Sequence, residues 1–205
     1  MDKSFERFSK QELAIIGKLN TPFKVQEFID TLKYNESKRI SSLEVIKGKK
    51  ADCLEAAMFA IAVLKYHNYE CFLVDLESVR DEDHELCIYK KDGLYGSIAQ
   101  SKFLGLKGKY PVYKTIRELI MCYYEHYFNF FGELTLRAYS IPIRISNLKW
   151  IYSLDELEKI EKKLFTIKHY KIVDPDLKLP LVSIDKFRRE ILLFPKNIRV
   201  GKKYR

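Results

Sequence analysis

The 205-residue chain contains little glycine and proline, with 8 and 6 residues respectively. Disordered and low-complexity chains are typically rich in these residue types, so their scarcity argues against that class. The sequence also lacks an apolar run of the roughly 20 residues that a membrane helix needs, and no signal-peptide pattern follows its first residues. From these absences we expect a globular protein with no membrane segment and a cytoplasmic location.

Cysteine is scarce too, and no two cysteines have the CxxC spacing that is typical of zinc and redox sites. Cys71 and Cys87 fall within predicted strands and Cys122 within a predicted helix, which indicates buried, reduced thiols. A zinc site built from Cys53, Cys71, Cys87 and His84 is an alternative that spacing alone leaves open, although the ligands are unpaired. We therefore expect no metal and no other cofactor.

Acidic residues are outnumbered, with 28 Asp and Glu against 37 Lys and Arg, for a formal net charge of +9. Such an excess is compatible with acidic partners, including nucleic acid. The basic residues are scattered, however, and cluster only at residues 47–50 and 199–205, without any nucleic-acid-binding motif. We interpret them as solvated surface and expect no nucleic acid and no membrane as partner. The sequence does not indicate an oligomeric state.

What the sequence does contain is a large apolar content, at 47% hydrophobic residues with 14 Tyr and 13 Phe, enough for one ample core. Ser9 and Glu12 form a capping-box pattern, and Thr21 followed by Pro22 predicts a second helix start. We expect these two helices to cover the core. The polar segment 34–42 is then expected to be a loop near the site described below.

The stretch from residue 48 to residue 101 organises the rest of the chain. Residues 54–64 are apolar nearly all round, which predicts a buried helix with Cys53 in its first turn. The helix dipole, with Lys49 and Lys50 just upstream, is expected to stabilise a thiolate there. Strands are predicted at residues 70–76, 84–90 and 94–100, with a hairpin turn at Asp92 and Gly93.

His84 begins the second of these strands, and the length of the turn decides what lies opposite it. A two-residue turn places His84 opposite Ser101, and a three-residue turn places it opposite Gln100. Either side chain is a candidate for orienting the imidazole. The adjacent Asp83 is a poor candidate, because neighbouring strand residues point to opposite faces.

These residues resemble the transglutaminase-like superfamily of papain-type cysteine enzymes. Ala51-Asp52-Cys53 is similar to the family's cysteine at a helix start, and Asp83-His84-Glu85-Leu86 is similar to its histidine at a strand start. Tyr95 stands for the aromatic residue before the family's aspartate, whose expected position holds Ala99. The resemblance extends over residues 20–131 and is closest to an uncharacterised bacterial group of transglutaminase-like proteins.

The resemblance implies an α+β, papain-like fold in which a Cys-bearing helix packs on a small antiparallel sheet. Residues 1–131 would form this core with its N-terminal helices, and residues 132–205 a C-terminal extension packed on it. In the extension we expect an extended segment at 134–145 with Pro142 at a sheet edge, a helix after Ser153, a strand at 169–173 and a helix at 183–194. Before it, residues 116–131 predict a long helix with aromatic residues facing the core.

The function that the resemblance implies is thiol-dependent acyl transfer or hydrolysis of an amide or peptide bond in a peptide or protein substrate. Cys53 would be the nucleophile, His84 the base and then the acid, and Gln100 or Ser101 the residue that orients the imidazole. The pattern does not choose between hydrolysis and transfer. The alternative is a non-catalytic binding or scaffolding module, because the family's aspartate is absent.

Overall fold

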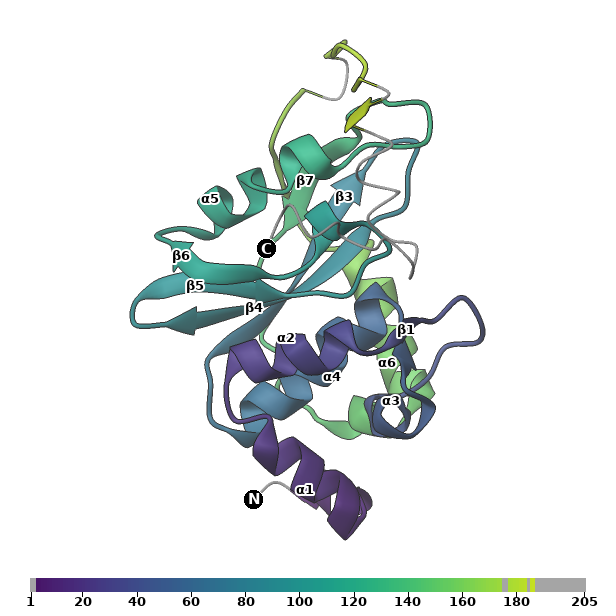
Figure 1. The fold of residues 1–205 in the computed structure, drawn as a ribbon, viewed down its shortest axis with the longest axis vertical. Coiled ribbons are helices and arrows are strands. Elements are labelled where there is room, and N and C mark those ends of the chain that lie inside the picture. Colours follow the sequence, from purple (N-terminus) through teal and green to yellow (C-terminus); the bar gives the residue numbers. More distant parts are fainter. Residues whose placement is uncertain (1–2, 175–176, 184, 187–205) are drawn as a thin grey trace, which may run out of the picture.

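A six-stranded antiparallel sheet lies at the centre of the chain, with the strand order β6-β5-β4-β3-β7-β8 (Figure 1). The computed structural model describes residues 3–174, 177–183 and 185–186. The strands are β3 (Cys71–Ser78), β4 (His84–Lys91), β5 (Leu94–Ile98), β6 (Lys109–Tyr113), β7 (Leu136–Ser140) and β8 (His169–Lys171). A separate parallel pair, β1 (Lys33–Tyr34) with β2 (Lys50–Ala51), lies beside the helices.

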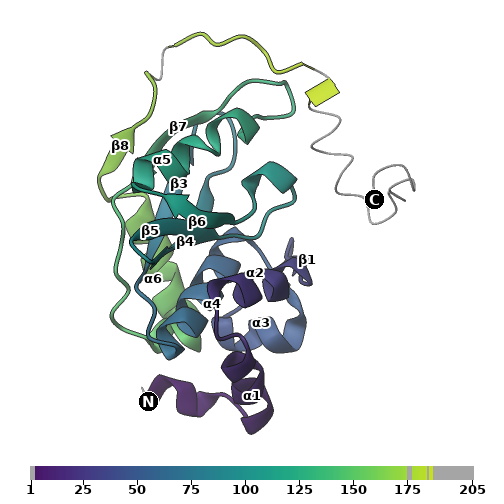
Figure 2. The same cartoon turned by 60° about the vertical axis from the view of Figure 1, so that its left-hand side comes forward.

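Helices cover both faces of the sheet, which makes the fold an α+β arrangement as expected. They are α1 (Lys10–Lys18), α2 (Pro22–Asp30), α3 (Ser42–Gly48), α4 (Cys53–Tyr66), α5 (Ile116–Met121) and α6 (Leu154–Leu164). Short 3-10 helices occupy Lys3–Arg7, Leu104–Leu106, Tyr124–His126 and Lys149–Ile151. Figure 2 shows α5 and α4 on opposite sides of the strands. None of the described helices is long and apolar enough to cross a membrane.

The helix α4 is the centre of the larger of two hydrophobic cores. Every residue from Leu54 to Leu64 is buried, so the prediction of a helix that is apolar all round is confirmed. It packs between β3 and β4 on one side and the helices α2 and α3 on the other. Burial of this kind removes most of the helix's apolar surface from water, and each Å² removed stabilises the fold by roughly 25 cal/mol. The position of its first residue, Cys53, is therefore fixed by the core.

The hairpin between β4 and β5 has the register that a two-residue turn predicts. Lys91 pairs with Leu94, and Asp92 and Gly93 both adopt positive φ, at 51° and 81°. Residues of β4 then alternate between the two cores: Leu86 and Ile88 face α5, whereas Cys87 and Tyr89 face α4. The same alternation places the side chains of His84 and Glu85, at the beginning of β4, on opposite faces of the sheet.

Helix starts at the N-terminus follow the sequence closely. Ser9 and Glu12 form the predicted capping box of α1, and Thr21 caps α2 with Pro22 in its first turn. The helix α3 with its start at Ser41 and the strand β6 were not predicted. Both unpredicted elements are short, so their apolar periodicity is weak.

Two predictions beyond residue 115 are wrong. The helix expected at 116–131 ends at Met121, and of its aromatic residues Tyr123 and Tyr127 are buried whereas Phe130 and Phe131 are 75% and 82% exposed. The segment with Pro142 is not at a sheet edge, because β7 lies between β3 and β8. The proline follows the strand instead of interrupting it, so β7 keeps all of its backbone donors.

Residues after 132 contribute to the same sheet and the same core as the residues before them. β7 pairs with β3, and Leu157 and Leu164 of α6 belong to the core around α4. The strand and the helix expected near 169 and after Ser153 are present as β8 and α6. The helix expected at 183–194 falls largely outside the described residues.

Candidate functional site

Cys53 is the first residue of α4, and Asp52 is its N-cap. The Asp52 carboxylate accepts from the Glu55 N–H at 2.7 Å, and the Glu55 carboxylate accepts from the Asp52 N–H at 2.8 Å. The N–H groups of Cys53 and Leu54 have no acceptor within the helix, as at any helix start. The first turn of α4, which carries Cys53, therefore has two backbone donors without an intrahelical acceptor.

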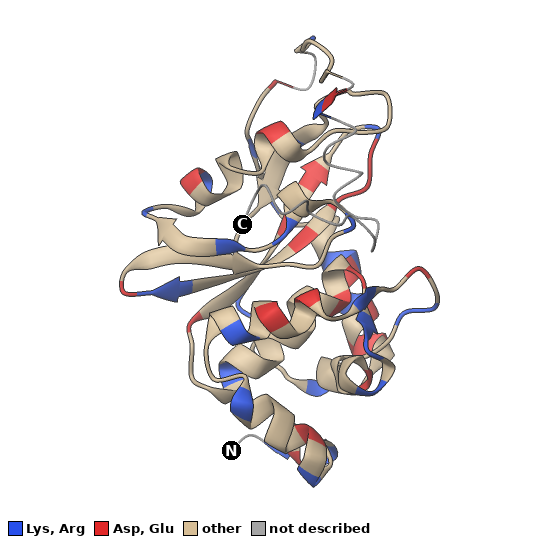
Figure 3. Cartoon of the chain, viewed as in Figure 1, with Lys and Arg blue, Asp and Glu red and all other residues tan. Residues whose placement is uncertain are grey.

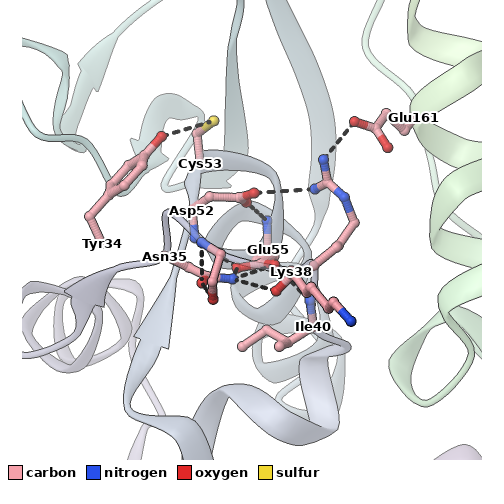
Figure 4. Close-up of polar contacts among 10 residues, drawn as sticks. Tyr34, Asn35, Lys38, Ile40, Asp52, Cys53, Glu55 and Glu161 are labelled. Carbon is pink, nitrogen blue, oxygen red and sulfur yellow. Dashed lines mark hydrogen bonds and ion pairs between the residues drawn. The ribbon is translucent and has the colours of Figure 1, made fainter.

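The parallel pairing of β1 with β2 brings Tyr34 next to this helix start. Tyr34 lies beside Ala51 in the register, two residues before Cys53. Its hydroxyl donates to the Cys53 Sγ over 3.8 Å, as Figure 4 shows. The polar segment 34–42 was expected near the site, and its first residue forms a contact with the sulfur.

Glu55 holds the rest of that segment in place. Its carboxylate accepts from the Asn35 side-chain amide at 2.9 Å and from the Ile40 N–H at 2.7 Å, in addition to the Asp52 N–H (Figure 4). Glu55 is 1% exposed. A buried carboxylate with three donors is stable only while they remain in place, so Glu55 ties residues 35–40 to the start of α4.

Arg39 joins the same helix start to α6. Its guanidinium contacts the Asp52 carboxylate at 3.3 Å and the Glu161 carboxylate at 2.6 Å. Burial, followed by the charge of Glu55, raises the pKa of Asp52 to about 6 in spite of the arginine. The contacts of Arg39 therefore close one side of the site with side chains from distant parts of the chain.

Cys53 lies where two cavities meet. The smaller, of about 60 Å³, is lined by Cys53 and Tyr34 together with His84, Ser101 and Leu106, among other residues. The larger, of about 610 Å³, is lined by Cys53, Arg39 and Lys102 and by six acidic residues, Glu36, Asp52, Glu82, Asp83, Glu85 and Glu161. Acidic and basic residues are otherwise interspersed along the chain (Figure 3). The opening in front of the sulfur is thus acidic in a chain of net charge +9.

His84 is buried at the start of β4 and is held by the backbone. Its Nε2 lies 2.8 Å from the Leu106 carbonyl oxygen. Because a carbonyl only accepts, Nε2 carries the proton and Nδ1 holds a lone pair. Burial lowers the pKa of His84 to about 4, so the ring is neutral at physiological pH. The residue that orients the imidazole is therefore a main-chain carbonyl.

The two side chains predicted to orient His84 have other partners. The Gln100 amide donates to the carbonyls of Ile29 and Leu32 at 3.1 and 3.2 Å, and its oxygen accepts from the Ser101 N–H. The Ser101 hydroxyl accepts from the Phe103 N–H at 3.0 Å, although Ser101 borders the small cavity. Among the described residues, no hydrogen bond joins Gln100 or Ser101 to His84.

Cys53 and His84 border one cavity but do not contact each other through a hydrogen bond in the described part of the chain. The reason is the alternation of β4. Cys87, three residues after His84, faces α4, so His84 faces the opposite side. The catalytic roles assigned to Cys53 and His84 remain predictions.

The pKa of Cys53 is raised well above its ordinary value, mainly by burial and then by the charges of Glu85 and Asp52. This is the opposite of the thiolate that the helix dipole led us to expect. The dipole is worth about 0.3–1 kcal/mol at most helix ends, less than the desolvation of a charged group costs. Lys50, expected to help, donates to the Ser37 hydroxyl.

Glu85 is the residue of the site that sequence reasoning missed. Its side chain interacts with the Cys53 thiol, and burial raises its pKa to about 8. Its Oε2 is enclosed and has no hydrogen-bond partner among the described residues. A signal was present in the sequence: Glu85 lies two residues before Cys87 on the same strand, so both face the same side.

The other cysteines are free thiols. Cys71 and Cys87 are buried, as predicted, and Cys122 is half-buried just after α5. Within the residues that the structure describes, no cluster of three His, Cys, Asp or Glu side chains could hold a metal ion. The chain matches no protein-family model and no curated protein, so the reading of this site rests on its geometry.

Proposed function

We propose that this protein carries out thiol-dependent acyl transfer or amide hydrolysis at Cys53, in a transglutaminase-like domain of papain-type architecture. The observation that carries the proposal is the place of Cys53, at the first turn of a buried helix where two cavities meet. A nucleophile there is accessible to a substrate from the larger cavity. Two titratable side chains lie nearby, His84 in the lining of the smaller cavity and Glu85 in the lining of the larger.

The chemistry begins with removal of the thiol proton. The raised pKa keeps Cys53 protonated at neutral pH, so a neighbouring base must accept that proton as the sulfur attacks. The Cys53 Sγ then forms a bond to the carbonyl carbon of the substrate. When the carbon–nitrogen bond breaks, the amine leaves with the proton and a thioester remains. Water or a second amine attacks the thioester, and the thiol recovers a proton.

The start of α4 supports the charge that develops on the substrate oxygen. The N–H groups of Cys53 and Leu54 point from the helix end, and neither has an intrahelical acceptor. Such donors stabilise an oxyanion, and loss of one donor costs about 10²–10³ in rate in well-studied cases. The hydroxyl of Tyr34, at 3.8 Å from the sulfur, adds a third donor beside the reacting atoms.

The second candidate is a non-catalytic binding or scaffolding module. It is favoured by the high pKa of Cys53 and by the engagement of Gln100 with α2 in place of the imidazole. In that case the acidic cavity in front of Cys53 would bind a peptide or protein without breaking or making a covalent bond.

Incubation of the full chain with casein and a fluorescent primary amine separates these possibilities. Transfer places fluorescence on casein, and hydrolysis creates new amino termini. The Cys53→Ala variant should lose whichever product forms, while Cys122→Ala, which changes a half-buried thiol elsewhere, should retain it. If neither product from the wild-type chain exceeds that from Cys53→Ala, the binding module is the better account.

A further inference from the structure

We infer that the Glu85 carboxylate, and not the His84 imidazole, accepts the proton of the Cys53 thiol. This inference rests on the proposed function and assigns a further catalytic residue to it. Glu85 and Cys53 line the same cavity, the carboxyl interacts with the thiol, and its enclosed Oε2 has no hydrogen-bond partner among the described residues.

The geometry of β4 is the first step of the argument. Cys87 and Tyr89 point toward α4 and belong to its core, so Glu85, on the same face, points toward the start of α4. His84 points to the other side, where its Nε2 donates to the Leu106 carbonyl. A base must lie within hydrogen-bonding reach of the proton that it removes. Glu85 interacts with the thiol, whereas the hydrogen bond recorded for His84 in the described part of the chain goes to Leu106.

The surroundings of Glu85 make it a base in the right pH range. The groups that face it are Cys53 and Asp52 at the start of α4, Asp75 on β3, and Arg39 from the preceding loop. Burial raises the pKa of Glu85 to about 8, and the charges of Asp75 and Asp52 add to the rise, whereas Cys53 and Arg39 lower it. About a tenth of the Glu85 side chains are then ionised at pH 7 and half near pH 8.

Asp75 sets the order in which these carboxyls ionise. It lies directly opposite Glu85, and its Oδ2 is 2.9 Å from His169 Nε2. Burial raises the pKa of Asp75, but the hydrogen bond with His169 opposes this increase, so the pKa reaches only about 6. Asp75 therefore becomes charged first and keeps the proton on Glu85 until the pH approaches 8. Once ionised, Glu85 is a much stronger base than a solvated carboxylate.

The proton transfer balances without any other reagent. The Cys53 S–H bond breaks and a Glu85 O–H bond forms while the Sγ–carbon bond to the substrate is made. On collapse of the tetrahedral intermediate, the carbon–nitrogen bond breaks and the Glu85 proton moves to the leaving amine. Glu85 is then again a carboxylate, ready to take a proton from the water or amine that resolves the thioester.

The test is the rate at which iodoacetamide alkylates Cys53 between pH 5 and pH 10, followed by peptide mass spectrometry. In the wild-type chain the rate should rise with a midpoint near pH 8 and then level off. In Glu85→Gln the plateau should be lost, with labelling at pH 8 at least tenfold slower and still rising at pH 10. A carboxylate that acted only through its charge would have the opposite effect, because its removal lowers the thiol pKa and speeds labelling.

Three further variants keep the inference falsifiable if Glu85→Gln fails to fold. Glu85→Asp should restore part of the plateau, and Asp75→Asn should move the midpoint below pH 8, since it removes a like charge opposite Glu85. His84→Gln should label like the wild type. Labelling of Glu85→Gln that equals or exceeds the wild-type rate overturns the inference, as does a loss confined to His84→Gln. The latter result leaves the proposed function intact, whereas failure of the casein assay removes the function itself.

Discussion

Asp75 and Glu85 lie directly opposite each other on β3 and β4, two carboxyls in register on the buried side of the sheet. Like charges in this position repel each other, and the burial of both carboxyls adds to the free-energy cost of ionising them. His169 lowers this cost for Asp75, because its Nε2 lies 2.9 Å from the Asp75 Oδ2. For Glu85, the interaction with the Cys53 thiol and the charge of Arg39 lower the pKa by less than burial raises it. The pair thus connects the first turn of α4 with the last described strand of the sheet.

The stability of the chain should depend on pH through Glu85. Its pKa in the folded state, about 8, lies above the ordinary value of 4.5. The protonated carboxyl therefore stabilises the fold fully below pH 4.5, and that contribution is lost as the pH rises to 8. Relative to the wild type, the free energy of unfolding of Glu85→Gln should increase by about 3 kcal/mol across this range. This figure is smaller than the full pKa shift would give, because the side chain is half-buried.

Urea unfolding of both proteins at pH 5, 7 and 9 measures this difference. Glu27→Gln, which changes an exposed carboxyl on α2, is the control and should leave the pH dependence unaltered. A constant difference between Glu85→Gln and the wild type from pH 5 to pH 9 would show that Glu85 ionises normally in the folded protein.

Removal of the Tyr34 hydroxyl should slow the reaction of Cys53. That hydroxyl donates to the sulfur and lowers the pKa of the thiol, so Tyr34→Phe raises it further. A single hydrogen bond of this kind is worth about 1 kcal/mol, which predicts labelling by iodoacetamide about fivefold slower at pH 8. Tyr69→Phe removes a hydroxyl that donates to the Asn20 carbonyl and should label at the wild-type rate. Faster labelling of Tyr34→Phe would mean that Tyr34 mainly restricts access of the reagent to the Cys53 sulfur.

Glu55 should be among the most costly positions to change near the site. An amide in its place has one acceptor oxygen for three donors, from Asn35, Ile40 and Asp52. We expect Glu55→Gln to lower the free energy of unfolding by about 3 kcal/mol. Glu44→Gln alters an exposed capping box on α3 and should cost about 1 kcal/mol or less. Equal losses in urea unfolding would show that the segment 35–40 does not depend on Glu55.

Gln100 should stabilise the fold without controlling the imidazole. Gln100→Leu removes the amide that donates to the carbonyls of Ile29, in α2, and of Leu32, just after it, at a cost of about 2 kcal/mol. The His84 titration, followed by NMR, should not move, because the ring is held by the Leu106 carbonyl. A shifted His84 titration with unchanged stability would instead support the role that the sequence suggested for Gln100.

Local signals in the sequence were sufficient for the elements around the site. The all-apolar segment predicted α4, and Asp92 with Gly93 predicted the β4–β5 turn and its register, because each signal is contained in a few neighbouring residues. The long helix expected after residue 115 failed because aromatic residues at helical spacing are also compatible with a 3-10 turn and a loop. Periodicity alone does not distinguish these possibilities.

The partners of the site residues were not predictable in the same way. Whether His84 or Glu85 faces Cys53 depends on which side of the sheet α4 covers, and that is a property of the whole core. The Leu106 carbonyl that holds His84 lies in a short 3-10 helix with no sequence signature. Helix-dipole reasoning predicted a thiolate because it leaves out burial, which the sequence does not reveal.

The most direct test of the account is whether Cys53 forms a thioester. The full chain would be mixed with p-nitrophenyl acetate at pH 8, quenched in acid and analysed by peptide mass spectrometry. We predict an acetyl group on Cys53 that hydroxylamine removes, its absence in Cys53→Ser, and a rate at least tenfold lower in Glu85→Gln. Acetylation of Cys122 at a rate equal to or above that of Cys53 would contradict the account.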